Sequence, residues 1–243
     1  MKFMNTEIDN LTMQETLQAI DRLIQEDRSA YVVTPNVDHI VQLETSKELQ
    51  AVYENASLIL TDGKPLLWIA KWYGTPIKEK ISGSDLFPLL CDMAAKKGYK
   101  MFFLGAAEGV AAKAAENLAN KFKGLQVVGT YSPPFGFEKN QDEMDKIKSM
   151  IKEAAPHILI VGLGCPKQEK FMYHHCKELG VPISFGLGAS FDFEAGNIKR
   201  APRWMSNHGL EWLFRITQDP KRMAKRYLVD DRKILGLAIK YRK

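Results

Sequence analysis

The chain has 243 residues, of which 45% are hydrophobic and 26% are charged, as in an ordinary globular protein. No apolar stretch approaches the ~20 residues that span a bilayer, no signal-peptide core precedes the first helical pattern, and three cysteines without a CxxC pair argue against a disulfide framework. The sequence therefore predicts a cytoplasmic protein with a net charge of +5, whose basic excess is confined to residues 199–243.

The first predicted helix begins after Thr12, which forms a capping-box pattern with Glu15, and runs to about Glu26. Beyond it, short apolar runs alternate with helical patterns. The apolar runs are 30–33, 58–60, 101–104, 127–128, 158–161 and 183–185; the helical patterns are 37–55, 65–72, 84–97, 109–122, 141–154 and 167–179. This alternation predicts an α/β fold, with a Rossmann-like parallel sheet and helices on both faces.

The second apolar run ends in Asp62-Gly63, and a helical pattern follows at once. In an open parallel sheet, ligands bind beyond the carboxyl ends of the strands, so Asp62 would stand at a pocket rim as a base. The alternative is that Asp62 only caps the next helix. Right-handed crossovers favour the first interpretation, because they bring the residues after each strand to one edge. The residues expected to share a cleft there are Thr34, Asn36, Asp62, Gly105, Gln168 and Asp192.

Glycines follow two of the predicted strands, in Gly105-x-x-x-Gly109 and Gly162-x-Gly164. Glycine lets the backbone approach a diphosphate, which the N-terminus of the next helix also favours. Neither segment completes the G-x-G-x-x-G fingerprint, and no P-loop motif is present. The sequence thus disfavours NAD and P-loop enzymes and leaves a nucleotide-linked substrate open.

Metal chemistry has weak support in the sequence. Asp192-x-Glu194 could hold a divalent ion, or it could be a loop acid that bonds the backbone. We expect no metal and no cofactor, in which case cationic side chains must neutralise a departing diphosphate. Lys80 is one candidate, with a solvated loop charge as the alternative, and arginines near the C-terminus are others.

The composition changes after Gly196, where Trp, Arg, Lys and Met become frequent. We expect an α/β core at 1–196 and a helical appendage at 197–243. Aromatic and aliphatic residues among Lys and Arg are typical of helices that lie on an anionic membrane surface. Alternatively, the apolar stripe packs on the core and the basic face is solvated. A nucleic-acid partner is disfavoured, because no motif for one is present.

Several motifs in one order resemble the WecG/TagA/CpsF glycosyltransferases over nearly the whole chain. They are Thr34-Pro35-Asn36-Val37-Asp38, Thr61-Asp62-Gly63-Lys64-Pro65, Ser82-Gly83-Ser84-Asp85, Gly162-Leu163-Gly164-x-Pro166-Lys167-Gln168-Glu169, Phe191-Asp192-Phe193-x-Ala195-Gly196, Arg200-Ala201-Pro202-Arg203-Trp204-Met205 and Gly209-Leu210-Glu211-Trp212-Leu213-Phe214-Arg215.

The resemblance implies an inverting enzyme that acts without an obligatory metal. Its donor would be UDP-N-acetylmannosamine and its acceptor undecaprenyl-diphosphate-linked N-acetylglucosamine, joined β-1,4 in wall teichoic acid linkage-unit synthesis. Such an enzyme would be peripherally attached to the inner face of the cell membrane; a homo-oligomer stays open. One alternative is transfer of another hexose, such as glucose, in capsule or exopolysaccharide assembly. A remote alternative is a Rossmann-type redox or methyl-transfer enzyme.

The resemblance also implies roles for individual residues. Asp62 would be the general base on the acceptor hydroxyl, and Thr34 and Gln168 would orient the sugars. Where the family often has Arg, Lys80 keeps the charge but loses the bidentate fork. The arginines implied at the diphosphate are Arg215 and Arg222, with Arg226 a looser match. The other substrate-binding candidates are Asn36, Gly105, Gly162, Gly164, Lys167 and Asp192.

Overall fold

The structure is a computed structural model that describes residues 1–242, except for the side chains of Arg203, Asn207 and Arg222. The described chain contains a six-stranded sheet in the order β4-β3-β8-β7-β5-β6, in which all neighbours are parallel. Its strands are β3 (Ala30–Val33), β4 (Leu58–Ile59), β5 (Lys100–Gly105), β6 (Gln126–Tyr131), β7 (Ile158–Gly162) and β8 (Ile183–Gly186). The predicted parallel α/β fold is confirmed.

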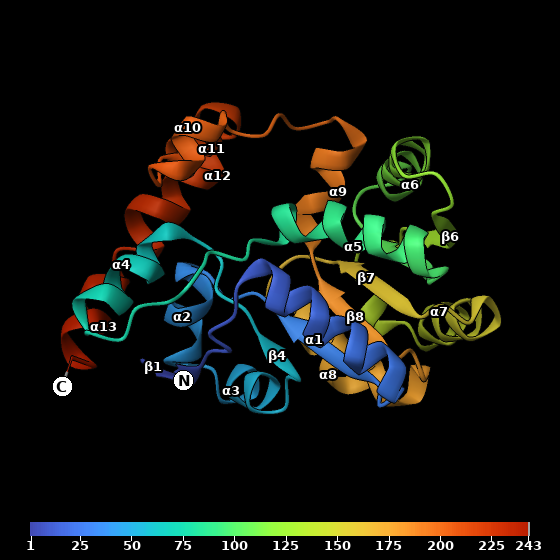
Figure 1. Ribbon diagram of the computed structural model, residues 1–243, viewed down its shortest axis with the longest axis horizontal. Coiled ribbons are helices and arrows are strands. Elements are labelled where there is room, and N and C mark those ends of the chain that lie inside the picture. The colour runs from blue at the N-terminus through green and yellow to red at the C-terminus, as the bar shows by residue number, and fades with distance from the viewer. Residues whose placement is uncertain (243) are drawn as a thin grey trace.

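Helices cover both faces of the sheet (Figure 1). One layer contains α2 (Val37–Leu43), α3 (Lys47–Glu54), α4 (Lys64–Trp72), α7 (Gln141–Ala154) and α8 (Lys167–Leu179). The other contains α1 (Met13–Glu26), α5 (Gly83–Lys97), α6 (Val110–Lys121) and α9 (Gly188–Ala195). Side chains of β3 alternate between the layers: Tyr31 and Val33 enter the first core, and Ala30 and Val32 enter the second. This two-sided burial explains the continuous apolar runs in the sequence.

Most predicted helices are confirmed, and two differ from the prediction. The Thr12–Glu15 capping box opens α1 as expected. The pattern at 37–55 forms two helices rather than one, because Ser46 accepts a hydrogen bond from the N–H of Leu49 and starts α3 afresh. Helix α9 stands where the sequence shows no helical pattern, and its Phe191 is fully buried against Phe87 and Phe103.

Two small elements complete the core. An antiparallel pair, β1 (Lys2–Phe3) and β2 (Thr6–Glu7), precedes α1, and a 3₁₀ turn, η1 (Phe137–Lys139), precedes α7. Phe3 and Phe137 are buried in the same core as the first helix layer.

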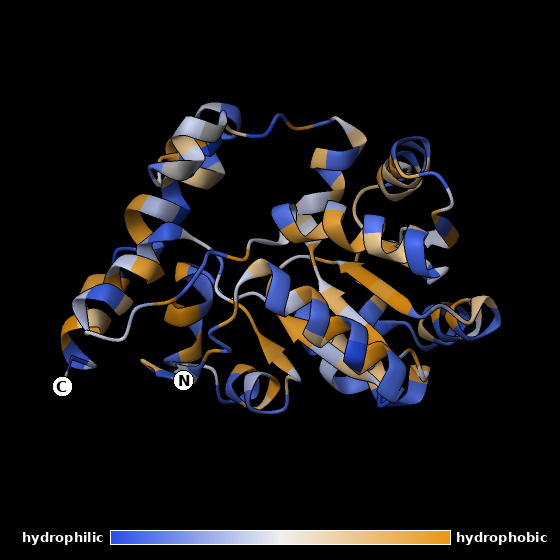
Figure 2. Ribbon diagram, viewed as in Figure 1, coloured by the Kyte–Doolittle hydropathy of each residue, from blue (hydrophilic) through white to orange (hydrophobic). Residues whose placement is uncertain are grey.

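The C-terminal residues form a chain of short helices along one end of the molecule, beside α4 and α2 (Figures 1 and 2). They are α10 (Arg203–Asn207), α11 (Glu211–Gln218), α12 (Pro220–Lys225), the π-helical turn η2 (Arg226–Asp230) and α13 (Lys233–Lys240). Ile234 and Ala238 of α13 are buried in the first core, and Tyr73 donates a hydrogen bond of 2.7 Å to the carbonyl of Ala238. Among residues 1–242, no helix is long and apolar enough to span a membrane.

A crevice is expected where neighbouring strands send their chains to opposite faces of the sheet. Strands β3 and β8 are such neighbours: β3 leads into α2 in one layer, and β8 leads into α9 in the other. The loops after β3, β4, β7 and β8 therefore border a single opening at the carboxyl edge.

Candidate active site

In the described chain, two cavities meet at the carboxyl edge of the sheet. The sheet-edge cavity, about 550 Å³, is lined by the carboxyl ends of β3, β7 and β8 and by the loops and helices that follow them, including Thr34, Gly162, Gly164, Gln168, Gly188 and Asp192. The tail cavity, about 400 Å³, lies between α4 and the C-terminal helices, and its wall includes Pro65, Lys80, Trp212, Tyr227, Leu228 and Leu235. Asn36, Asp62, Arg215 and Arg226 line both cavities. These four residues thus form the boundary between a glycine-rich space and a largely apolar one.

Asp62 does not cap the helix that follows it. The N-cap of α4 is Gly63, whose φ of 104° suits glycine, and no side chain caps this helix. The backbone N–H of Asp62 donates to the carbonyl of Pro35, which ties the β4 end to the β3 loop at 2.8 Å. The carboxylate is therefore left to the cavities, as the first interpretation of the sequence predicts.

The surroundings of Asp62 suit a base. Burial raises its pKa from 3.8 to about 6, against the opposing effect of the nearby Arg215 guanidinium. Glu211 raises the pKa as well, and Lys80 lowers it. A carboxylate with this pKa is ionised at neutral pH and still accepts a proton more readily than an ordinary aspartate.

Thr34, Asn36 and Gln168 come together in the sheet-edge cavity, as predicted. Asn36 is the N-cap of α2 and accepts hydrogen bonds from the N–H groups of Asp38 and His39. Gln168 is 6% exposed, in the first turn of α8. Both amides are therefore held by helix termini rather than by free loops.

Two glycines, at the end of β8 and at the start of α9, make room for Gln168. A Cβ on Gly186 would lie 2.9 Å from Gln168 Nε2, and one on Gly188 would lie 2.8 Å from Gln168 Oε1. Either contact is too short for a real side chain, so a substitution here would displace the amide.

Two predicted residues do not line either cavity. Gly105, with a φ of 111°, packs against Gly162, where an added Cβ would lie 2.4 Å from the carbonyl oxygen. Lys167 points to Glu138, with which it forms an ion pair of 2.6 Å, and its ammonium lies 4.9 Å from the ring centre of Phe135.

Lys80 is an ion-paired group between core and tail, and not the solvated loop charge that the sequence left open. Its side chain is 13% exposed, and Nζ lies 3.0 Å from Asp85 Oδ2 and 4.0 Å from Glu211 Oε2. Asp85 also pairs with Arg200 and accepts from the Ser82 hydroxyl at 2.6 Å. Burial alone would raise the pKa of Asp85, but these hydrogen bonds and ion pairs together lower it to about 2.

Two arginines of the C-terminal helices are held at the site by hydrogen bonds and ion pairs. Arg215 donates to Glu211 at 2.8 Å, and its guanidinium lies 5.6 Å from the ring centre of Phe193. Arg226 donates to Asn36 Oδ1 at 3.1 Å and lies 3.6 Å from Asp38 Oδ2. The side chain of Arg222, the third arginine of the prediction, lies outside the described residues.

Asp192 lines the sheet-edge cavity and contacts Asn197 at 3.5 Å. It belongs to no cluster of metal-type ligands within the part of the chain that the structure describes. The one such cluster there consists of His39, Cys165 and Glu169.

Three residues with clear contacts at the site are absent from the sequence-based candidates. Glu211 connects Lys80 with Arg215 across the tail cavity. His39, which lines the sheet-edge cavity, forms a buried pair with Glu169. Both acids stand inside motifs that carry the family resemblance, whereas the pairing of His39 with a residue 130 positions away has no signal in the sequence.

Comparisons with known proteins identify the family of the chain. The Glycosyl transferase WecG/TagA/CpsF family matches residues 1–243, the whole chain. A Bacillus spizizenii protein named N-acetylglucosaminyldiphosphoundecaprenol N-acetyl-beta-D-mannosaminyltransferase is 34% identical over 203 residues, which cover 83% of this chain and 76% of that protein. A Bacillus subtilis protein of the same name is 29% identical over 202 residues, or 83% of this chain and 77% of its own length. The chain therefore belongs to the WecG/TagA/CpsF family of glycosyl transferases.

Proposed function

We propose that the enzyme transfers N-acetylmannosamine from UDP-N-acetylmannosamine to undecaprenyl-diphosphate-linked N-acetylglucosamine, with inversion to a β-1,4 linkage, in wall teichoic acid linkage-unit synthesis. The relatives' names support both the sugar and the lipid acceptor. The observation that carries the proposal is that Asp62 stands between two cavities of different character.

The nucleotide sugar is assigned to the sheet-edge cavity. Backbone at Gly162, Gly164 and Gly188 permits close approach of a diphosphate, and the N-terminus of α8 faces the same loop. Thr34, Asn36 and Gln168 offer a hydroxyl and two amides to the sugar. Arg215 and Arg226 supply positive charge where the diphosphate leaves.

The lipid-linked acceptor is assigned to the tail cavity. Its wall combines Pro65, Trp212, Leu228 and Leu235 with Lys80. Apolar side chains suit the first isoprene units, and the cations suit the acceptor's own diphosphate.

In the transfer step, Asp62 removes the proton from the acceptor hydroxyl as that oxygen attacks the anomeric carbon. The bond between this carbon and the UDP oxygen breaks on the opposite face, so the configuration inverts. The electron pair leaves with UDP, whose added charge the two arginines stabilise. General-base assistance of this kind contributes ~10²–10⁴-fold.

The direct test offers the purified enzyme a panel of UDP-sugars with a polyprenyl-diphosphate-N-acetylglucosamine analogue. We expect UDP release and a product mass increased by one N-acetylhexosamine only with UDP-N-acetylmannosamine, and a rate that EDTA leaves nearly unchanged. A product from UDP-glucose instead would replace the proposed sugar, and a rate lost to EDTA and restored by manganese would assign Asp192 and Glu194 to a metal.

The pKa of Asp62 predicts the acid limb of the pH profile. Since the base must be ionised, kcat/KM should rise with pH and level off above about 6, and fall about tenfold per pH unit below it. Arg215 lowers this pKa and Glu211 raises it, so Arg215→Met should move the limb to higher pH and Glu211→Gln to lower pH. Initial rates at acceptor concentrations well below KM measure these limbs; a limb that neither variant moves would exclude Asp62 as its source.

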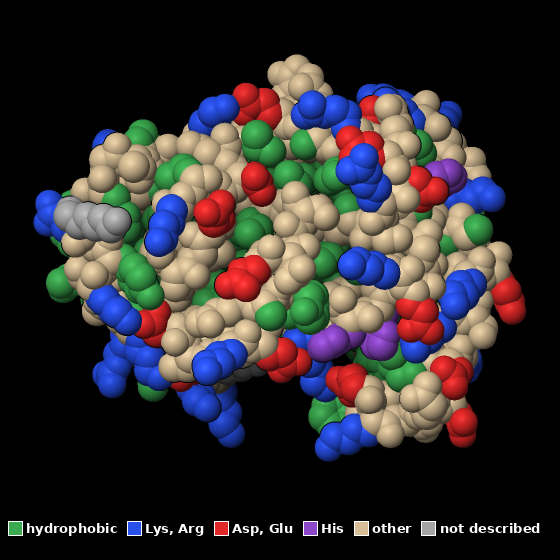
Figure 3. All heavy atoms as spheres, turned by 90° about the horizontal axis from the view of Figure 1, so that it is seen from below, with side chains coloured by type: hydrophobic (Ala, Val, Ile, Leu, Met, Phe, Trp, Pro, Cys, Tyr) green, Lys and Arg blue, Asp and Glu red, His purple; other side chains and the backbone are tan. Residues whose placement is uncertain are grey.

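We also propose that the tail end of the molecule rests on the inner face of the cell membrane. Large apolar side chains are exposed there on α4 and on the C-terminal helices, among them Trp68, Trp72, Trp204, Leu235 and Ile239. Lys and Arg side chains surround hydrophobic ones at this end (Figure 3). Near an anionic surface each Lys or Arg contributes ~1 kcal/mol, so several give reversible attachment.

Charge substitutions at two of these apolar residues should weaken attachment without unfolding the protein. Trp204 and Ile239 are 61% and 70% exposed, and neither lines the sheet-edge cavity or the tail cavity. We expect Trp204→Glu with Ile239→Glu to lower the fraction sedimenting with anionic vesicles at least several-fold. Phe135→Glu is the matched control, since Phe135 is fully exposed but lies in the loop after β6. Equal losses in both proteins would point to a general charge effect.

A further inference from the structure

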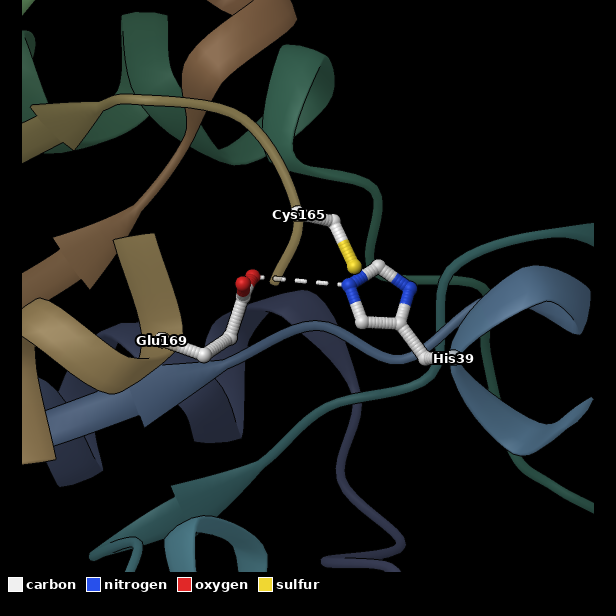
Figure 4. A group of neighbouring side chains, drawn as sticks. All are labelled: His39, Cys165 and Glu169. Carbon is white, nitrogen blue, oxygen red and sulfur yellow. Dashed lines mark hydrogen bonds and ion pairs between the residues drawn. The ribbon is translucent and has the colours of Figure 1, made fainter. Parts of the chain in front are cut away.

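A buried ion pair lies at the wall of the sheet-edge cavity, which His39 lines, and joins two helices that are distant in the sequence. Nε2 of His39, on α2, lies 3.4 Å from Oε1 of Glu169, on α8, and the side chains are 7% and 2% exposed. The thiol of Cys165 lies beside them (Figure 4). Because desolvation offsets much of the attraction within a buried pair, such a pair is a weak source of stability. Its contacts with the site suggest another role.

One side of the imidazole holds Asn36. His39 Nδ1 lies 2.9 Å from Asn36 Oδ1, which also accepts from the backbone N–H of Asp38 and from Arg226. An oxygen surrounded by donors fixes the orientation of the amide. The Nδ2 group of Asn36 is then the part that can meet a ligand in the cavities.

The other side of the imidazole acts on Gln168 through Glu169. Oε1 of Glu169 accepts from His39 and also from Gln168 Nε2, the latter at 2.8 Å. With its NH₂ group engaged, Gln168 keeps Oε1 as an acceptor that is buried and has no partner within the described residues. A hydroxyl or N–H of a sugar would satisfy it.

A protonated ring fits both contacts. Burial alone would lower the pKa of His39, but Cys165 and Glu169 interact with the ring and raise the pKa well above its ordinary value. Only an imidazolium donates from both nitrogens, to Asn36 Oδ1 at 2.9 Å on one side and to Glu169 on the other. The longer contact of 3.4 Å between the backbone N–H of Asn36 and Nδ1 is a hydrogen bond only when the ring is neutral and Nδ1 accepts.

We propose that His39 is a positioning residue of the transfer reaction: its ring holds Asn36 Oδ1 together with the backbone N–H groups and Arg226, and through Glu169 it turns Gln168 Oε1 toward the nucleotide sugar. The inference rests on the proposed function, since it presupposes that these two amides contact the donor. Misplacement by about 1 Å costs on the order of 10²-fold in rate, so losses of that order in kcat/KM are expected when His39 is replaced by Ala.

Two conservative variants separate the contacts of the two ring nitrogens. The amide of Asn reaches about as far as Nδ1, so His39→Asn can keep the contact with Asn36 and loses the contact with Glu169. The amide of Gln reaches about as far as Nε2, so His39→Gln can keep the contact with Glu169 and loses the contact with Asn36. Each should retain more activity than His39→Ala. His174→Ala is the control, because His174 is half exposed and contacts Glu48 away from the site.

Double-mutant cycles give the decisive readout. If His39 acts through the amides, His39→Gln should cost little more in the Asn36→Ala background, and His39→Asn little more in the Gln168→Ala background. Losses that simply multiply would reduce His39 to a structural role and overturn the inference. An undiminished rate in His39→Ala, with Asn36→Ala and Gln168→Ala impaired, would overturn it and leave the proposed function standing. If Asn36→Ala and Gln168→Ala are unimpaired, the inference and the proposed contacts of these two amides with the sugar are both wrong.

Loss of one partner can unfold a protein by leaving a buried charge. Thermal unfolding of each variant therefore accompanies the kinetics, and His39→Gln combined with Glu169→Gln removes both charges together at similar volume. This pair should fold and still show a raised KM for the UDP-sugar. A wild-type rate in the pair would contradict the inference, and so would a rate lost on chelation and restored by zinc, which would make the cluster a metal site.

Discussion

Asp62→Asn should lower turnover by at least ~10²-fold, because the amide cannot take the proton of the attacking hydroxyl. Asparagine has nearly the shape of aspartate, and no cap of α4 is lost, since Gly63 occupies that position. The dissociation constant of the UDP-sugar, measured calorimetrically, should change much less than kcat. The acid limb near pH 6 should also disappear from the residual rate.

The matched control is Asp92→Asn, which removes the same charge from an exposed pair with Lys96 on α5. It should keep the wild-type rate, since exposed pairs contribute little to stability. Undiminished turnover in Asp62→Asn would remove Asp62 from the chemistry and would require another base along the shared wall of the cavities.

Deleting the residues after Gly196 should have the other large effect. The deletion removes Arg215 and Arg226, and with them one wall of both cavities. Loss of a single preorganised stabiliser of developing charge typically costs ~10²–10³-fold, so the loss of both should bring turnover close to the background. Binding to anionic vesicles should fall with it. A truncated protein that retains both properties would make the tail dispensable.

The deletion also exposes core surface, because Ile234 and Ala238 of α13 are buried in it. A second variant therefore keeps the whole chain and changes only charge: Arg215→Met with Arg226→Met. We expect this variant to bind vesicles and to unfold near the wild-type temperature, but to turn over as slowly as the deletion. Circular dichroism and sedimentation separate this outcome from simple misfolding.

The fold could be predicted from the sequence because burial on both faces leaves continuous apolar runs. The departures arise where tertiary packing outweighs local pattern. No helical pattern follows the last apolar run, 183–185, yet α9 begins at Gly188 because Phe191 fills the core between Phe87 and Phe103. Ser46 breaks a periodicity that otherwise continues, since a capping side chain outweighs the apolar spacing.

The site could be predicted as far as strand ends identify it. Asp62, Thr34, Asn36 and Gln168 follow strands and do meet. Gly105 also follows a strand, but its neighbour Gly162 occupies the space beside it. The contact of Lys80 with Glu211 of α11 depends on how the C-terminal helices pack against the core. Local residue spacing carries no information on that packing. The division into residues 1–196 and 197–243 stays a prediction.

The pairing of β3 with β8 has a consequence for how the protein is made. Ala30 pairs with Ile183, so the two sides of the crevice are synthesised far apart in time. Until β8 leaves the ribosome, β3 presents an unpaired edge of Tyr and Val, a surface prone to pair with other chains. Such long-range parallel pairing closes slowly, because the entropy of a large loop is lost before its contacts form. Catalytic competence should therefore be the last property that a newly synthesised chain acquires, and chaperones that shield strand edges should raise the yield of active enzyme.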